Sequence, residues 1–275
     1  MLLTAVVKKT ILLALLILIW GASWSVNKMA LDYTPPLIYA AIRGILGGLF
    51  LSVFILHSWK KIQWRQHWQK YLISSFVNVT CFFGIQTIGL IYLPGGLFSV
   101  LVYFQPVLVG IFAWLWLGEE MSWKKFIGFI LGFFGIFVIS AEGITGSISI
   151  IGVLLALLTA LSWALGVIYV KKVGTEVDGM WMVVFQSFLG GGMLLVFGSF
   201  FESWSQVEWT LPYVGAVLFG STLGIPVAYV IYYHLIYSGE ASKVAAFTFL
   251  VPVVSVIISS IFLKESLTLS LLVGL

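Results

Sequence analysis

Long apolar segments, separated by short polar connections, make up most of this chain and leave few folds open to it. A helix of about 20 apolar residues crosses the hydrocarbon core of a bilayer, where backbone polar groups must be satisfied internally. The composition agrees, because 61% of the residues are hydrophobic and only 9% are charged, against roughly a quarter charged in soluble domains. The sequence therefore predicts an all-α polytopic membrane protein with ten transmembrane helices. Their expected ranges are 10–31, 36–56, 71–91, 95–117, 124–141, 149–170, 180–200, 211–236, 243–263 and 268 onward.

The second half of the chain repeats features of the first half at nearly constant offsets. Trp20 recurs as Trp163, and the LGG at 46–48 recurs at 189–191, both 143 residues later. Four further residues recur 146 positions later, so that Pro106, Leu117, Glu119 and Gly128 correspond to Pro252, Leu263, Glu265 and Gly274. Such self-similarity indicates a duplicated architecture. We expect two five-helix repeats, 1–141 and 149–275, which are inverted relative to each other because each holds an odd number of spans; secondary transporters often have this construction.

The two ends of the chain need separate interpretation. Lys8 and Lys9 precede an apolar run that ends in small residues, as in a signal peptide. A comparable segment at 163–171, in the middle of the chain, favours a first helix that is retained. The tenth span stops at Leu275, although its counterpart in the first repeat continues to about Ala141. We therefore expect a sequence truncated within its last helix; the alternative is a short helix supported by a neighbour.

Basic residues are distributed unequally between the two expected sides of the membrane. The side with the amino terminus and the loops after spans 2, 4, 6 and 8 carries Lys8, Lys9, Lys60, Lys61, Arg65, Lys70, Lys124, Lys125, Lys171, Lys172 and Lys243. The other side carries Lys28 and Lys264. Because cytoplasmic loops are enriched in Lys and Arg, we expect a cytoplasmic amino terminus and a plasma or inner membrane location. The net charge of +4 then reflects topology, and nucleic acid is not an expected partner.

Four segments carry a resemblance to a known family. They are WGASWSVNKMAL in the first span, the P-x6-R spacing from Pro36 to Arg43, QPVLVGIFAWLWLGEEMS, and VPVVSVIISSIFLKESLT. Together they resemble the drug/metabolite transporter (DMT) superfamily, and specifically its EamA-type members. The resemblance covers nearly the whole chain and implies ten helices in two five-helix halves, a central substrate cavity, and transport of amino acids, metabolites or drugs. It does not identify the substrate.

Arg43 lies well inside the second predicted span. A membrane-embedded charge is costly and is a functional hypothesis by default. The planar guanidinium suits a substrate carboxylate, which it engages through two parallel hydrogen bonds. The structural alternative is that Arg43 bonds to helix-end carbonyls or extends to an interface. Gln186 occupies the equivalent position in the second repeat, so the pair predicts an asymmetric site for an amino acid or another polar organic ion.

The remaining candidates for the substrate site are polar or aromatic residues inside the spans: Trp20, Asn27, Asn78, Gln86, Trp163 and Tyr229. Asn78 and Gln86 are eight residues apart, which puts them near one face of the third span. For the polar residues the alternative is ordinary interhelical hydrogen bonding, worth about 1 kcal/mol in membranes. The aromatic residues are expected to form cavity walls, because ligand pockets are mostly apolar; anchoring in lipid is their alternative role.

Repeat-related residues also predict bends and helix starts. Pro106 and Pro252 stand near the middle of the fourth and ninth spans, where proline removes a helix hydrogen bond. We expect both spans to bend there and to act as hinges, the alternative being a role in packing alone. Glu119 and Glu265 follow the same two spans, and each is expected to stabilise the amino-terminal start of the helix that follows it.

These features favour a secondary transporter that exports small organic metabolites, with amino acids or related compounds as the leading class. Multidrug efflux is the closest alternative, and a membrane-embedded enzyme or assembly factor acting on lipid is a distant one. The sequence has no phosphate-binding loop, metal-ligand spacing or convincing catalytic set, so we expect neither an enzyme nor a cofactor or metal. No Asp or Glu falls inside a predicted span, which leaves coupling through a buried acid unsupported. The expected partners are a small-molecule substrate and the lipid bilayer, for a monomer or a homodimer.

Overall fold

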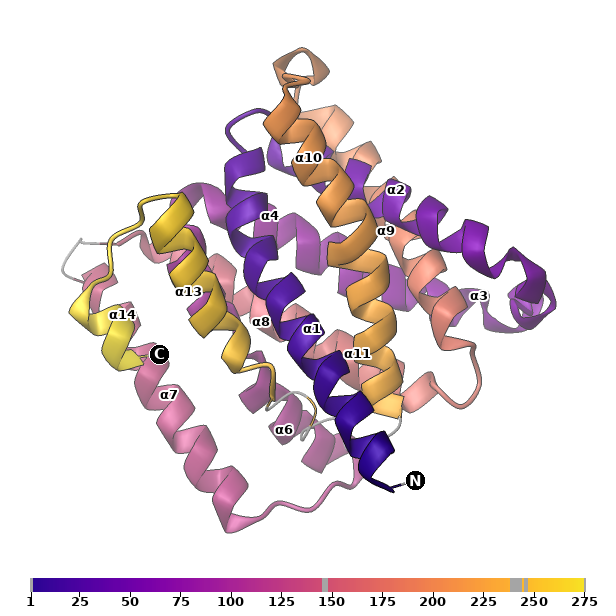
Figure 1. Ribbon diagram of the computed structural model, residues 1–275, viewed down its shortest axis with the longest axis horizontal. Coiled ribbons are helices and arrows are strands. Elements are labelled where there is room, and N and C mark those ends of the chain that lie inside the picture. Colours follow the sequence, from indigo (N-terminus) through magenta and orange to yellow (C-terminus); the bar gives the residue numbers. More distant parts are fainter. Residues whose placement is uncertain (1, 145–147, 238–243, 245–246, 275) are drawn as a thin grey trace.

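The computed structural model of the chain is a bundle of helices (Figure 1). It describes residues 2–144, 148–237, 244 and 247–274, and no strand occurs among them. The first half contains α1 (Leu2–Ala30), α2 (Pro36–Ile55), η1 (Leu56–Lys61), α3 (Trp64–Ser75), η2 (Phe76–Cys81), α4 (Phe82–Tyr92), α5 (Gly95–Val102), α6 (Gln105–Leu117) and α7 (Trp123–Ile144). The second half contains α8 (Ile150–Val173), α9 (Gly179–Phe201), η3 (Trp204–Gln206), α10 (Leu211–Phe219), η4 (Gly220–Val227), α11 (Ala228–Tyr237), α13 (Leu250–Phe262) and α14 (Leu269–Gly274).

Seven helical stretches in the described part of the chain are long and apolar enough to cross a membrane. They are Lys9–Ala30, Pro36–Lys61, Trp64–Tyr92, Gly95–Leu117, Ile150–Val173, Gly179–Phe201 and Leu211–Tyr237. Each overlaps one of the ten predicted spans. The other three correspond to α7, to the 13-residue α13 and to the 6-residue α14. The start of the ninth predicted span, including Lys243, falls largely outside the described residues.

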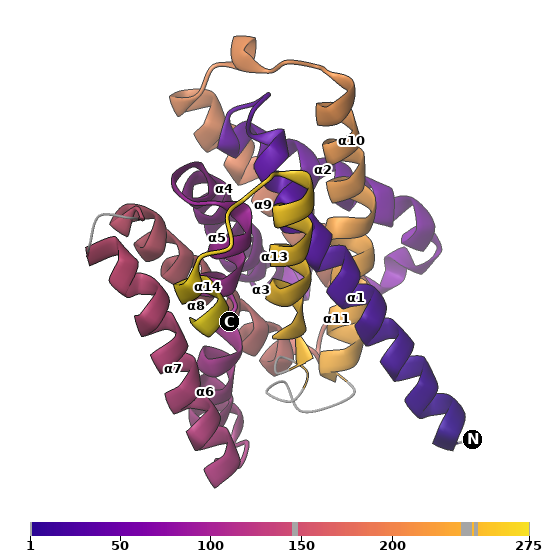
Figure 2. The ribbon, with the colours of Figure 1, turned by 60° about the vertical axis from the view of Figure 1, so that its left-hand side comes forward.

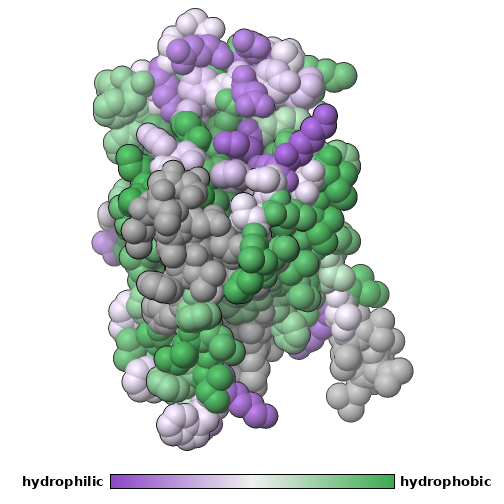
Figure 3. All heavy atoms as spheres, turned by 90° about the vertical axis from the view of Figure 1, so that its left-hand side faces the viewer, coloured by the Kyte–Doolittle hydropathy of each residue, from purple (hydrophilic) through white to green (hydrophobic). Residues whose placement is uncertain are grey.

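The surface has the polarity expected of a protein surrounded by lipid. Large apolar side chains are strongly exposed in several parts of the chain. For example, the exposed fractions of Val53, Leu131 and Ile261 are 66%, 65% and 66%. Figure 3 shows hydrophobic residues over the middle of one face and hydrophilic residues gathered toward its upper end. Exposed apolar surface of this extent indicates contact with a membrane or a partner. With the seven long apolar helices, it identifies a multi-pass membrane protein.

Several connections of the bundle lie at its upper or lower end. Those preceding α2 and α10 are at the upper end, whereas the amino terminus and the α6–α7 connection are at the lower end (Figures 1 and 2).

Two ion pairs join the region around η1 and α3 to the α8–α9 connection. Lys61 lies 3.3 Å from Asp178, and Lys70 lies 2.5 Å from Glu176. These contacts therefore link the first and second halves of the chain at polar connections.

Two spans contain π-helical segments at nearly equivalent positions of the repeat. In the third span, η2 lies between α3 and α4; in the eighth, η4 lies between α10 and α11 and contains Pro226. A π turn inserts an extra residue into the helix and changes which side chains share a face. The prediction that Asn78 and Gln86 lie on one face assumed a regular α-helix, and the π turn at Asn78 removes that assumption.

Both repeat-related prolines stand in the first turn of a helix and not in the middle of one. The fourth span breaks at Tyr103 and Phe104, and Pro106 is the second residue of α6. Pro252 is the third residue of α13. The first N–H groups of a helix have no intrahelical acceptor, so proline removes no hydrogen bond there. The fourth span is interrupted near Pro106, as expected. Because a new helix starts there, the proline costs no backbone hydrogen bond. The hinge role stays a prediction.

The repeat-related helices α2 and α9 pack directly against each other. Glycines allow this approach. A Cβ atom built on Gly44 would lie 3.4 Å from the Cα atom of Gly191, and one built on Gly48 would lie 2.9 Å from the ring of Phe188. Small residues let helix backbones come close in membranes, where van der Waals packing drives association. The LGG segments that revealed the repeat are thus partly explained by this helix crossing.

Candidate functional site

A narrow cavity, with a volume of about 30 Å³, lies where helices of both halves meet. It is lined by Trp20, Ser23, Trp24, Asn27, Arg43, Phe82, Phe83, Gln86, Tyr103, Trp163, Gly220, Gly224 and Tyr229. The structure therefore brings together, from α1, α2, α4, α8 and α11, the predicted site residues Trp20, Asn27, Arg43, Gln86, Trp163 and Tyr229. Asn78 and Gln186 are not among the lining residues. Residues of such different sequence position meet here because the cavity is formed by the packing of the two halves.

Arg43 is held by two side-chain amides. Its Nη1 donates to Oδ1 of Asn27 at 2.9 Å, and its Nη2 donates to Oε1 of Gln86 at 3.0 Å. The Tyr39 hydroxyl donates to the same Asn27 oxygen at 2.9 Å. The guanidinium carbon lies 4.4 Å from the ring centroid of Phe83 and 5.1 Å from that of Tyr39. The side chain is thus fixed on several sides by neutral groups.

The positive charge of Arg43 has no carboxylate partner among the described residues. The ion pairs found there are Lys61–Asp178, Lys70–Glu176 and Lys125–Glu119. Arg43 is only 3% exposed, and its Nε has no hydrogen-bond partner in the described part of the chain. A buried cation without a counter-ion is costly. Neutral amides and aromatic faces reduce that cost, while leaving the site electrostatically favourable for an anion.

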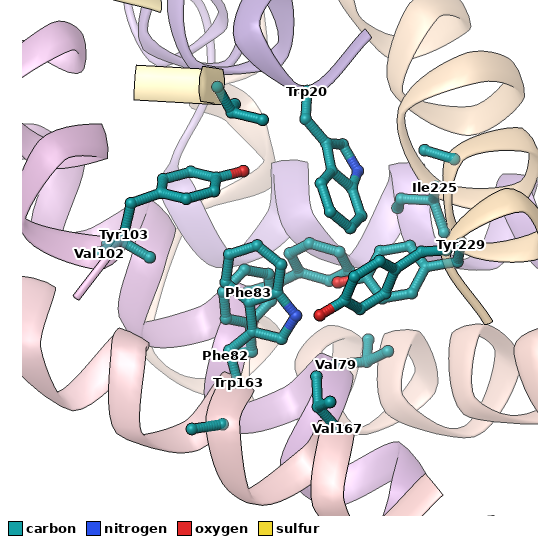
Figure 4. Close-up of a cluster of buried hydrophobic side chains, with 14 of the residues drawn as sticks. Trp20, Val79, Phe82, Phe83, Val102, Tyr103, Trp163, Val167, Ile225 and Tyr229 are labelled. Atoms are coloured by element: carbon teal, nitrogen blue, oxygen red, sulfur yellow. The ribbon is translucent and has the colours of Figure 1, made fainter. Parts of the chain in front are cut away.

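Aromatic side chains form the other walls of the cavity. The rings of Trp20 and Trp163 meet edge to face with centroids 5.2 Å apart, and Trp20 lies 5.7 Å from Tyr229. Trp163 also contacts Phe82 and Tyr103, with centroid distances of 5.3 and 5.4 Å. Figure 4 shows these rings converging from separate helices. The two repeat-related tryptophans therefore lie in direct contact inside the protein, and not at a lipid interface.

Sequence reasoning missed several residues that shape the cavity. Tyr39 shares the acceptor of Arg43 and lies four residues before it, one helical turn away; that spacing was the available signal. Gly220 and Gly224 in η4 leave room for the site. A Cβ atom at Gly220 would lie 3.4 Å from Cδ of Arg43, and one at Gly224 would lie 3.4 Å from Oγ of Ser23. The four-residue glycine spacing was visible in the sequence, but its partners depend on tertiary packing.

Asn78 and Gln186 belong to a second polar cluster. Oε1 of Gln186 accepts hydrogen bonds from Ser74 and Tyr233, both at 3.0 Å. Nδ2 of Asn78 donates to the Ser74 hydroxyl at 3.2 Å. These contacts join the third, seventh and eighth spans. The bonds of Gln186 are interhelical, whereas the bond of Asn78 lies within the third span. The role of both residues in substrate binding remains a prediction.

Glu265 stabilises a different helix from the expected one. Its carboxylate accepts hydrogen bonds from the backbone N–H groups of Gly95 and Gly96, at 2.7 and 2.9 Å, at the amino terminus of α5. The helix after Glu265 is capped by Thr268, whose hydroxyl accepts from the backbone of Leu271 at 3.2 Å. We expected Glu265 to favour the start of the helix that follows it, whereas its carboxylate binds the start of α5. The physical reason holds, because a carboxylate favours a helix amino terminus, but the tertiary structure supplies another terminus.

Polar contacts close to Glu265 join α1 to helices of both halves. Lys28 donates to the backbone carbonyl of Leu90 at the end of α4. The hydroxyls of Ser25 and Ser259 are hydrogen bonded at 2.8 Å, which connects α1 to α13. Since Asn27 lies on the same helix between Ser25 and Lys28, these bonds also constrain the position of the Arg43 acceptor.

The fold and the cavity define the class of the protein. It is a multi-pass membrane protein with a polar and aromatic cavity between its two halves. The chain belongs to the EamA-like transporter family, whose model matches residues 8–141 and 150–275. The two matched ranges correspond closely to the repeats expected from the sequence. Membership of this family makes the protein a transporter of the DMT type.

Individual relatives agree with the family assignment. The chain is 52% identical over 268 residues to a Bacillus subtilis (strain 168) protein named uncharacterized transporter YvbV, with 98% of this chain and 88% of the relative covered. It is 26% identical to an Escherichia coli (strain K12) protein named probable amino-acid metabolite efflux pump, with 95% and 89% covered. A crystal structure aligns with a TM-score of 0.75 at 16% identity, covering 97% of this chain and 93% of the other, which supports the fold alone.

Proposed function

We propose that this protein is a secondary transporter that exports small organic metabolites by alternating access around the cavity that contains Arg43. The observation that carries the proposal is a buried guanidinium without a carboxylate partner among the described residues, at a cavity between the two halves. Intramembrane charges are rare and face substrate or ion pathways. Amino acids or related compounds are the leading substrates. The name of the E. coli relative supports this class.

The electrostatics favour a carboxylate at Arg43. Two unit charges about 4 Å apart attract by about 4 kcal/mol at an effective dielectric constant of about 20. A planar guanidinium can also orient a carboxylate through two hydrogen bonds. The Nε–H, which has no partner among the described residues, and the position of Arg43 in the cavity lining support an approach from the cavity side. Trp20, Trp163 and Tyr229 would then contact the apolar part of the substrate, while Asn27 and Gln86 hold the guanidinium in place.

Alternating access is supported by the duplicated sequence and by the contacts between its halves. We propose ten helices in two inverted repeats, 1–141 and 149–275, with Pro106 and Pro252 at hinges. The helix breaks next to these prolines support bending there. The Trp20–Trp163 contact joins the two proposed repeats. Gln186 and Asn78 would contribute to the site in another conformation of the cycle. The distribution of basic residues supports a plasma or inner membrane protein with a cytoplasmic amino terminus, as a monomer or homodimer.

Multidrug efflux is the second candidate function, and the aromatic walls favour it. Aromatic faces accept many apolar or cationic compounds. The buried charge of Arg43 disfavours cations in the same cavity, so metabolite export has the stronger support. A membrane-embedded enzyme or assembly factor acting on lipid stays a distant alternative, with no observation that favours it over transport.

Uptake into proteoliposomes tests the proposal. The purified chain would be reconstituted and supplied with a panel of radiolabelled amino acids and related carboxylates, with and without a pH gradient. Saturable uptake is expected, with strong loss in Arg43→Gln and partial loss in Arg43→Lys, because Lys keeps the charge but loses the planar fork. Size-exclusion profiles establish that the variants are folded. Uptake of organic cations alone, or carboxylate uptake that is unchanged in Arg43→Gln, would contradict a carboxylate-binding carrier.

A further inference from the structure

The orientations of the two amides that hold Arg43 follow from the chemistry of the guanidinium. Arginine has only hydrogen-bond donors. The atoms of Asn27 and Gln86 that face it must therefore be their oxygens. The observed contacts have this form, at 2.9 Å for Asn27 and 3.0 Å for Gln86. The assignment of oxygen and nitrogen is thus physically required.

This orientation leaves donors to face the remaining space. The Asn27 oxygen accepts two hydrogen bonds, from Arg43 and from Tyr39. The amide nitrogens of Asn27 and Gln86 have no hydrogen bond to the described residues, and both side chains line the cavity. Arg43 Nε and Trp163 Nε1, which are also donors, have no partner in the described part of the chain. Unsatisfied buried donors favour a ligand that brings acceptors.

The same cavity offers little to a second positive charge. No Asp or Glu is among its lining residues. The aromatic rings next to Arg43 are already occupied by its guanidinium, which lies over Phe83 at 4.4 Å and over Tyr39 at 5.1 Å. An ammonium group close to Arg43 would meet electrostatic repulsion, and the Asn27 oxygen that could accept its protons is already used twice. Carboxylate acceptors are favoured here and ammonium donors are not.

We propose that the site prefers organic monocarboxylates that lack an ammonium group and carry an apolar or aromatic body, over zwitterionic amino acids and over organic cations. This inference rests on the proposed function of the same cavity, and it replaces amino acids by related carboxylates without an ammonium group as the leading substrates. The carboxylate is bound by the guanidinium and the two amide nitrogens. The body of the substrate packs against Trp20, Trp163 and Tyr229, whose rings contact one another in this structure.

Three compounds that share a phenyl ring on a two-carbon chain test the inference. They are 3-phenylpropionate, with the carboxylate alone; L-phenylalanine, with carboxylate and ammonium; and phenethylamine, with the ammonium alone. Binding to the detergent-solubilised full chain would be measured by calorimetry, which is not affected by passive diffusion of the weak acid. We expect 3-phenylpropionate to bind about tenfold or more tightly than L-phenylalanine, because a site discriminates strongly when polar groups are left unpaired. Phenethylamine should not bind measurably.

Each alternative result has a distinct meaning. Equal or tighter binding of L-phenylalanine overturns the inference and leaves a carboxylate-binding carrier intact. Binding of phenethylamine alone overturns both the inference and the proposed role of Arg43. Binding of none of the three overturns the inference for aromatic bodies, and the uptake panel decides separately whether the proposed function survives.

A charge substitution gives an independent comparison. Gln86→Glu puts a carboxylate next to Arg43, so affinity for 3-phenylpropionate should fall about tenfold or more because the guanidinium is already paired. The exposed Gln206→Glu makes the same chemical change at a polar connection and should leave the affinity unchanged. Unchanged affinity in a folded Gln86→Glu protein contradicts the inference. If this variant does not fold, the three measurements on the unmodified chain still decide it.

Discussion

Gly190, Gly191 and Gly192 are consecutive residues of α9 that face different environments, so alanine at each position tests how closely this helix must pack. A Cβ atom at Gly190 would lie 2.7 Å from the backbone oxygen of Ser75. One at Gly191 would lie 2.9 Å from the backbone nitrogen of Ile45 in α2. Gly192 has nothing within 4 Å of this position. The third glycine is therefore a matched control for the other two.

The expected magnitudes follow from two opposing effects. Alanine stabilises a helix interior by about 0.5–1 kcal/mol relative to glycine, because glycine loses more backbone entropy on folding. Overpacking costs about 1–3 kcal/mol. The upper part of that range applies at Gly190 and Gly191, since backbone atoms block the space and a whole helix must move. We expect a net loss of about 1–2 kcal/mol at each of them, and a gain of about 0.5–1 kcal/mol at Gly192.

Reversible unfolding of the purified variants in mixed micelles measures these differences. The 12 tryptophans of the chain provide a fluorescence signal, and circular dichroism provides a second probe for agreement between transitions. Gly192→Ala should unfold at a higher denaturant concentration than Gly191→Ala. Equal stability of these two variants would refute the claim that α2 and α9 require glycine at their crossing.

Three further results are expected. Asn27→Leu leaves two buried donors without their acceptor and should lower the free energy of unfolding by about 2–4 kcal/mol. Asn27→Asp keeps an acceptor oxygen and should lose less stability. Similar losses in both variants would contradict the hydrogen-bond argument. Glu265→Gln removes the charge that caps α5 and should lower the free energy of unfolding in micelles by about 1 kcal/mol. The exposed Glu120→Gln is the control and should leave this free energy unchanged. Lys70 donates a hydrogen bond to Glu176 and lowers its carboxyl pKa below the ordinary 4.5, so this pair favours the folded state above the unfolded-state pKa and loses that effect as pH falls through the lowered value. The stability difference between the unmodified chain and Glu176→Gln should therefore vanish on acidification; a difference that persists or grows in acid would contradict the ion pair as its source.

Helix positions were the most predictable part of the fold. The second and seventh spans, expected at 36–56 and 180–200, correspond to α2 (Pro36–Ile55) and α9 (Gly179–Phe201). Their starts have local causes: proline suits the first turn of α2, and the Asp178 carboxylate accepts from the backbone of the first turn of α9. Hydrophobic length and capping act over a few residues, so a sequence contains this information directly.

The candidate site was predictable in part. Arg43 was identified by its charge inside a span, and Trp20 and Trp163 by their repeat offset, and all three line the cavity. The separate grouping of Asn78 and Gln186 was not predictable, because it depends on the π turn of η2 and on neighbours from other spans. The role of Tyr39 required knowledge that the Asn27 oxygen is shared.

The sequence by itself determined that the chain is helical, that it lies in a membrane and that its two halves are related, because these properties follow from local solvation and from repeated residue types. Only the tertiary structure decided which polar atoms meet. The Glu265 carboxylate could cap any nearby helix start, and packing placed it at Gly95 and Gly96. In the same way, packing turned the Asn27 and Gln86 oxygens toward Arg43 and left their donors to the cavity. Hydrogen bonds act over about 3 Å and depend on direction, so the chemistry of the site is defined only when distant segments are brought together.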